Sequence, residues 1–336
     1  MILAGDIGGT STRLGIFHLQ GTQVIPQVVE RYSSRSFGGL TDILSQFLAV
    51  QRQPFCVAAF GIAGPVLDGR VHTPNLPWIV DASAVATVLN GPPVFLLNDL
   101  EANACGVFAL PPTDFEPLNS EATADPTGNL AIISAGTGLG EAGIMFDGNK
   151  LRPLACEGGH AGFAPENELE AELWRFLAKK FGRVSAERIL SGPGLFNLYT
   201  FLRDTGRGVE SPALAAEIGA AADPAAVVSR SGLSGSSDLC AATLELFVRI
   251  YGSEAGNLAL KLKATRGVMI GGGIAPHLRP LLDRRFLDPF TAKGRMRPML
   301  EAIPVQLIRN DQAALYGSAL YAALKAGLLE HPHLAA

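Results

Sequence analysis

Short apolar runs alternate with amphipathic stretches along most of the chain, and this alternation indicates a layered α/β protein. Buried or half-buried strands are expected at 2–7, 13–17, 24–32, 55–62, 93–97, 130–133, 142–146, 267–270 and 303–308. Helices are expected at 39–50, 82–89, 168–181, 239–262 and 311–328. Elements alternate in this way when helices cover the faces of a largely parallel sheet.

The opening pattern of the chain returns near its middle. A strand, a glycine turn and a return strand occupy residues 2–17, and the same succession recurs at 130–146. We interpret this as a weak internal repeat, two copies of one βββαβα unit. Because 336 residues exceed what one core usually holds, two domains are expected. The small α/β domain would comprise 1–98 and 311–336, and the large one, with helical insertions, 99–310.

Composition narrows the classes of function. Hydrophobic residues make up 48% of the chain and charged residues 17%, which suits large buried cores rather than disorder. The net charge of −4, from 27 basic and 31 acidic residues, offers no basic excess for nucleic acid. No apolar run approaches the roughly 20 residues of a membrane span, and the N-terminus lacks the basic region of a signal peptide. Four widely spaced cysteines predict neither disulfides nor a zinc motif, so a cytoplasmic protein is expected.

Three glycine-rich turns follow apolar strands, at 5–13, 136–140 and 271–273. Glycine lets backbone N–H groups come close to a phosphate, and neighbouring Thr and Ser hydroxyls add hydrogen-bond donors. The first turn is neither a Walker A loop, because no Gly-Lys-Ser/Thr follows, nor a Rossmann fingerprint, because a strand follows it. Each turn alone is equally compatible with an ordinary hairpin or strand-to-helix turn. The three together indicate a nucleotide site.

Carboxylates mark the second candidate chemistry. Asp99 follows a buried strand, where ligands of parallel sheets gather, although it could equally cap a helix at 100–109. Glu157 and His160 flank two glycines, and zinc at His160 is disfavoured because only Cys156 stands beside it. Glu187 precedes a Ser-Gly-Pro-Gly segment, and its alternative role is that of a solvated helix carboxylate.

Read together, these motifs resemble the bacterial glucokinases that lack the zinc-binding cysteines of the ROK sugar kinases. That group belongs to the hexokinase–actin–Hsp70 superfamily. The resemblance runs nearly end to end and is carried by the segments 5–10, 61–65, 97–99, 136–140, 157–160, 183–194 and 256–260. It implies a two-lobed, duplicated ribonuclease-H-like (actin-like ATPase) α/β fold with a cleft between the lobes.

The resemblance also implies the site residues. Those implied for ATP are Asp6, Gly8, Gly9, Thr10, Thr12, Gly136, Thr137, Gly138, Gly272 and Gly273. Those implied for the sugar hydroxyls are Asn75, Asn98, Asp99, Glu157, His160 and Glu187. Within these sets, Asp6 is expected beside Mg²⁺ and Asp99 is expected to be the catalytic base.

The implied function is the transfer of a phosphoryl group from ATP to the 6-hydroxyl of glucose, giving glucose 6-phosphate and ADP, the first step of glycolysis. A homodimer is expected. Two alternatives stay open: a kinase for another hexose or phosphoryl donor, and a non-catalytic sugar sensor on the same fold. Asp99 favours the kinase, as does the position of the first hairpin, which begins at residue 5 and leaves no space before it for a DNA-binding domain.

Overall fold

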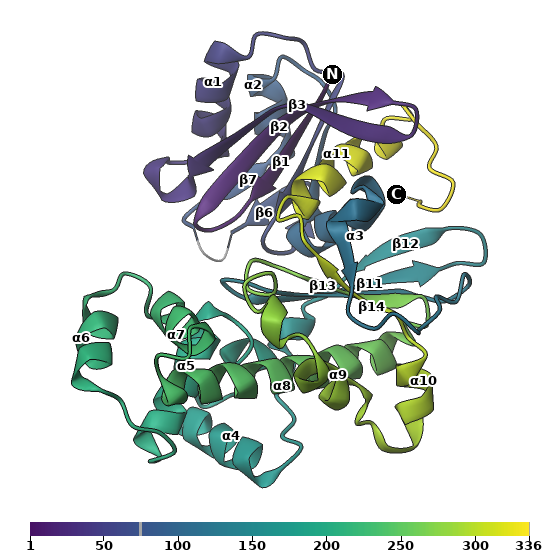
Figure 1. Ribbon diagram of the computed structural model, residues 1–336. Coiled ribbons are helices and arrows are strands. Elements are labelled where there is room, and N and C mark those ends of the chain that lie inside the picture. The colour runs from purple at the N-terminus through teal and green to yellow at the C-terminus, as the bar shows by residue number, and fades with distance from the viewer. Residues whose placement is uncertain (74–75, 336) are drawn as a thin grey trace. The chain divides into compact units, whose positions relative to one another are not determined.

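The computed structural model describes residues 1–73 and 76–335, in two compact units (Figure 1). The first unit contains residues 1–114, 142–156 and the chain from 310 onward, and the second contains 115–141 and 157–309. The expected division differs, because it assigns 99–114 and 142–156 to the larger domain. They join the first unit because helix α3 (Asp99–Ala109) packs on α11 (Ala313–Lys325) and strand β12 (Leu151–Ala155) packs on α3. Asn75, expected to contact sugar, lies outside the described residues.

The first unit is built on a five-stranded sheet in the order β3-β2-β1-β4-β8. The strands of this unit are β1 (Ile2–Ile7), β2 (Ser11–Gln20), β3 (Gln23–Ser33), β4 (Val57–Ile62) and β8 (Val94–Asn98), with a small second sheet of β5 (Val66–Leu67), β6 (Arg70–His72) and β7 (Ile79–Asp81). Strands β1, β4 and β8 are parallel, whereas β2 is antiparallel to both β1 and β3. The small sheet is an element that the hydrophobic pattern did not predict.

Helices cover both faces of this sheet (Figure 1). Helix α1 (Leu40–Val50) and helix α2 (Ala82–Val88) close an apolar core with one face. Helices α3 and α11 lie on the other face, where Gly15 and Gly61 of the sheet leave room for Leu315, Ala102 and Ser318. Close approach is possible there because a Cβ on Gly61 would lie only 2.6 Å from the Ala102 Cβ.

A six-stranded sheet has the order β12-β11-β10-β13-β14-β9. Its further strands are β9 (Phe115–Pro117), β10 (Leu130–Ala135), β11 (Leu139–Phe146), β13 (Gly267–Gly271) and β14 (Val305–Ile308). Strands β10, β13 and β14 are parallel. Counted along the chain, both sheets start with the order third, second, first, fourth, fifth. The repeat suspected from the glycine turns is therefore visible in the topology.

The rest of the second unit is helical. Its helices are α4 (Glu168–Phe181), α5 (Gly192–Asp204), α6 (Pro212–Ala220), α7 (Pro224–Leu233), α8 (Asp238–Leu262), α9 (Arg284–Thr291) and α10 (Arg297–Glu301). Helix α8 is the centre of this region, since α5, α7, α9 and strand β10 all pack against it. Among the helices of the described part of the chain, none combines the length and the apolar character that a membrane span requires.

Candidate functional site

The first hairpin, residues 6–13, lies at the carboxyl ends of the parallel strands. Ile7 stands opposite Ile62 in the register, and Ile62 stands opposite Asn98. The ends of β1, β4 and β8 therefore share one edge of the sheet. Since ligands of parallel α/β sheets bind at such an edge, the fold brings Asp6 and Asp99 to the same border of the first unit.

Asp6 faces Arg13 across the hairpin. The two residues are register partners, and Arg13 also forms an ion pair with the Asp311 carboxylate. The protein around the Asp6 carboxyl keeps water away and raises its pKa to about 6, with Arg13 lowering and Asp311 raising the pKa to smaller extents. A carboxylate whose charge is costly in this way gains free energy from a neighbouring cation.

The turn of the first hairpin is held from behind by Ser34. The Gly8 N–H donates to the Ser11 carbonyl at 3.0 Å, and the Ser34 hydroxyl donates to the Gly8 carbonyl at 2.7 Å. Ser34 also shares a hydrogen bond of 3.0 Å with Thr12, and both side chains are fully buried. Thr10 is exposed at the tip. The expected contact of Thr12 with ATP stays a prediction, and its burial favours a role in bracing the hairpin instead.

Asn98, and not Asp99, is the N-cap of α3. The Asn98 side chain accepts the Leu100 N–H at 2.8 Å and donates to the Gly64 carbonyl at 3.2 Å. Asp99 is the first helical residue, half-buried, and one of its oxygens lies 3.0 Å from the same Leu100 nitrogen. The capping alternative for Asp99 is thus largely taken over by its neighbour.

The second hairpin, residues 135–140, is tighter and is braced by other segments. The Gly136 N–H donates to the Gly138 carbonyl, and the Gly192 N–H donates to the Gly136 carbonyl, both at 2.8 Å. The Glu187 carboxylate accepts the Leu139 N–H at 3.0 Å. Glu187 therefore supports the backbone of this turn, a contact that the sequence did not indicate.

The sugar loop, residues 157–160, lies against the strand that leaves the second hairpin. A Cβ on Gly159 would lie 1.9 Å from the Leu139 carbonyl oxygen, so only glycine permits this approach. The loop directs His160 between two carboxylates: its Nδ1 is 3.8 Å from Glu187 and its Nε2 is 3.9 Å from Glu157. The fold thus gathers these three expected sugar residues around one exposed spot of the second unit.

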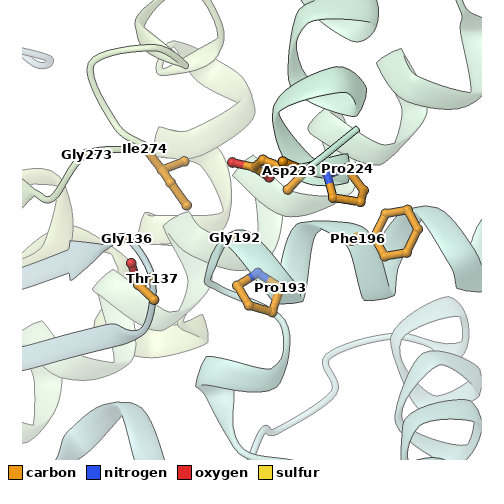
Figure 2. A pocket seen from close by; sticks show the side chains of 11 residues that line it. Gly136, Thr137, Gly192, Pro193, Phe196, Asp223, Pro224, Gly273 and Ile274 are labelled. Atoms are coloured by element: carbon orange, nitrogen blue, oxygen red, sulfur yellow. The ribbon is translucent and has the colours of Figure 1, made fainter. Parts of the chain in front are cut away.

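A pocket of about 530 Å³ opens beside the second hairpin (Figure 2). Its lining residues are Gly136, Thr137, Gly192, Pro193, Phe196, Ala222, Asp223, Pro224, Ala225, Gly273 and Ile274. Thr137 and Asp223 bear the polar side chains of this lining, and the other walls are apolar or backbone. A flat apolar group with a polar chain attached, such as a nucleoside phosphate, suits such a site.

The pocket joins two of the three glycine turns. Gly136, Thr137 and Gly273 line it as expected, whereas Gly272 packs against strand β10. Gly272 has a φ of +81°, and a Cβ there would lie 2.2 Å from the Ala135 carbonyl oxygen. The expected role of Gly272 toward ATP stays a prediction, and the geometry gives it a structural reason to be glycine.

The starts of α5 and α7 complete the pocket and were missed from the sequence. Ser191 caps α5 and Asp223 caps α7, each followed by proline in the first turn. Such a cap followed by proline predicts a helix start. It does not reveal that two helix starts 32 residues apart open onto the same cavity.

The comparisons with known proteins agree on one family. The family model described as Glucokinase matches residues 3–325. The glucokinase of Trichormus variabilis is 42% identical over 341 residues, which cover 96% of this chain and 99% of the relative.

Solved structures extend the likeness to three dimensions. The glucokinase of an Antarctic psychrotroph has a TM-score of 0.82 and 30% identity, over 96% of this chain and 98% of that one. A ROK family glucokinase from Streptomyces griseus, solved with glucose and AMPPNP, has a TM-score of 0.64 at 20% identity, over 96% and 98%. The α/β, two-domain sugar kinase fold expected from the sequence is confirmed.

Proposed function

The chain belongs to the glucokinase family, and from this premise we propose which residues carry out its reaction, the ATP-dependent phosphorylation of glucose. This reaction asks a protein chiefly for positioning and for neutralisation of charge, since the phosphoryl group passes through a loose transition state. The residue roles below are assigned on that basis.

ATP occupies the pocket beside the second hairpin. Its adenosine lies among the apolar walls formed by Pro193, Phe196 and Ile274, and its phosphates extend toward Thr137. The glycine N–H groups of both hairpins, with the exposed Thr10, are donors for the phosphate oxygens. The support for this assignment is that the pocket combines apolar walls with a glycine turn and a hydroxyl.

Glucose is bound by the sugar loop and by Asn98. Glu157 and Glu187 accept hydrogen bonds from sugar hydroxyls, and His160 between them can donate or accept. A site that relies on such hydrogen bonds discriminates strongly against an analogue that lacks the matching hydroxyl. A panel of hexoses and phosphoryl donors in a coupled assay would define the breadth of both specificities.

Asp99 is the general base. The proton of the glucose 6-hydroxyl passes to its carboxylate as the hydroxyl oxygen attacks the γ-phosphorus, and ADP leaves with the electrons of the broken P–O bond. The observation that carries this role is the division of labour at the start of α3: Asn98 caps the helix, which frees the strand-end carboxylate for chemistry.

Mg²⁺ fits beside Asp6. In the described residues no group of three or more His, Cys, Asp or Glu side chains is placed to hold a metal ion. An ion held by one carboxylate and the phosphates of ATP is the arrangement that Mg²⁺ commonly adopts, and it would neutralise phosphate charge. The raised pKa of Asp6 supports the assignment, because a nearby cation would favour the ionised carboxylate.

The replacement Asp99→Asn tests the assignment of the base. We expect kcat to fall about 10²–10⁴-fold, the usual contribution of general-base help, while glucose binding measured by calorimetry changes little. Glu101→Gln is the matched control: it lies in the first turn of the same helix, where glutamine can replace it in the capping box, and should leave kcat unchanged. An Asp99→Asn enzyme with nearly normal kcat would remove Asp99 as the base.

The surroundings of the enzyme complete the proposal. A homodimer and a cytoplasmic location, where ATP is at hand, remain our expectations for this chain. Equilibrium sedimentation of the purified protein measures the first directly, and a monomer at micromolar concentration would contradict it.

A further inference from the structure

A buried carboxyl group lies directly beneath the sugar loop. Glu141 stands on β11, is 1% exposed, and has no part in the roles assigned above. A Cβ on Gly158 would lie 2.1 Å from the Glu141 Oε2 and 2.9 Å from its Cδ. The Glu141 carboxyl therefore fills the space into which any side chain at 158 would project, and the sugar loop rests on it.

Helix α8 presents further charges to Glu141. Glu254, 7% exposed, faces it and accepts a hydrogen bond from Lys261 at 3.1 Å and from Asn257 at 3.0 Å. The buried Tyr251 of the same helix also interacts with Glu141 electrostatically. Burial, the largest cause, and the charge of Glu254 raise the pKa of Glu141 to about 7, whereas Lys261 lowers it.

We propose that Glu141 is a positioning residue for glucose: when protonated it supports the loop that carries Glu157 and His160, and when ionised it displaces that loop. The physical reason is the cost of a negative charge in a buried place that faces a second carboxylate. The contact with Gly158 transmits any movement of the Glu141 carboxyl to the loop backbone. This inference rests on the sugar-binding role proposed for Glu157 and His160.

The direction of the effect follows from the raised pKa. Glu141 keeps its proton below about pH 7 and loses it as the pH rises through that value. Glucose should therefore bind more weakly on the alkaline side. We expect the Kd for glucose to rise about fivefold or more between roughly pH 6 and pH 8.5, the range of an ordinary coupling between sites.

The replacement Glu141→Gln tests the proposal, because glutamine keeps the shape and removes the titration. The Kd for glucose, measured by calorimetry without nucleotide, should lose its alkaline rise in this variant, and the KM for glucose should do the same. Any pH dependence caused by His160 would remain. A Glu141→Gln protein with the pH profile of the wild type, or a wild type with no alkaline rise, would overturn the proposal.

Glu170→Gln is the matched control. Glu170 is also a buried glutamate of the second unit, but it caps the start of α4 and pairs with Arg249, and it has no contact with the sugar loop among the described interactions. This variant should keep the alkaline rise of the wild type. If it loses the rise as Glu141→Gln does, the effect belongs to buried carboxylates in general and the proposal fails.

A second variant covers the case in which Glu141→Gln does not fold. Glu254→Gln leaves Glu141 in place and removes the charge that faces it, so the midpoint of the change in glucose affinity should move to lower pH. An unchanged midpoint would count against Glu141 as the titrating group.

Glu157→Gln separates this inference from the proposed function. If it weakens glucose binding while Glu141→Gln keeps the wild-type pH profile, only the role of Glu141 is wrong. If it leaves glucose binding unchanged, the sugar loop does not bind glucose and both proposals fail.

Discussion

The two glycine hairpins have the same place in the strand order of their sheets but are held in different ways. The first is closed by a bond from Gly8 to Ser11 and braced by the buried hydroxyls of Ser34 and Thr12. The second is closed within three residues and braced by the Glu187 carboxylate and the start of α5.

The chemistry beside each turn differs as well. At the first hairpin, Asp6 ends the strand and Arg13 faces it. At the second, the corresponding strand ends in Ser134 and Ala135, with no charged side chain, and a pocket opens instead. A shared backbone arrangement thus supplies phosphate-binding N–H groups twice, while the side chains divide the work: the first hairpin suits a cation and the second suits a nucleoside.

The largest expected effect comes from removing the charge of the first hairpin. Asp6→Ala should lower kcat/KM for ATP by about 10³-fold, because neutralisation of phosphate charge is lost. Glucose binding by calorimetry should stay close to that of the wild type. Full activity in this variant would make the first hairpin structural only and would remove the contrast between the two turns.

A methyl group in the second hairpin should have the next largest effect. A Cβ at residue 138 would lie 2.5 Å from the Glu187 Oε2, so Gly138→Ala forces that carboxylate away from the Leu139 N–H. We expect kcat/KM to fall about 10²-fold for both substrates, as is typical of displaced catalytic groups.

The control for this change is Gly219→Ala in α6, where an added Cβ meets no atom within 4 Å. Steady-state kinetics should be normal in that variant. If Gly138→Ala affects ATP alone, Glu187 does not link the second hairpin to the sugar loop.

Removing the charge of Glu187 should have a smaller effect. Glu187→Gln keeps an oxygen that can accept the Leu139 N–H but loses the charged partner of the sugar hydroxyls and of His160. We expect the KM for glucose to rise about tenfold, since a hydrogen bond to a charged group is worth roughly 1.5–3 kcal/mol. The KM for ATP should rise less, and an unchanged KM for glucose would take Glu187 out of the sugar site.

The smallest effect is expected from the brace of the first hairpin. Ser34→Ala leaves the Thr12 hydroxyl and the Gly8 carbonyl without their buried partner, which should destabilise the protein by about 1–3 kcal/mol. Thermal unfolding measures this loss. The KM for ATP should rise a few-fold and that for glucose should not, so equal changes in both would contradict the separation of the two hairpins.

Much of the fold could be predicted from the chain because its signals are local. The strand 2–7 appears as predicted, and the long helix predicted at 239–262 is observed at Asp238–Leu262. Apolar spacing reports which residues are buried, and a buried run or stripe leaves few choices of element. The small sheet from β5 to β7 was missed because strands of two or three residues carry no periodicity.

The sequence by itself determined the kinds of chemical group in this protein: two glycine turns, a strand-end aspartate, and carboxylates beside a histidine. Only the tertiary structure decided how they are used. It made Asn98 the cap of α3, buried Thr12 behind its hairpin, and set Glu141 beneath Gly158. Such outcomes depend on atoms far apart in the chain that compete for the same space and the same hydrogen-bond donors, and no local pattern records which of them prevails.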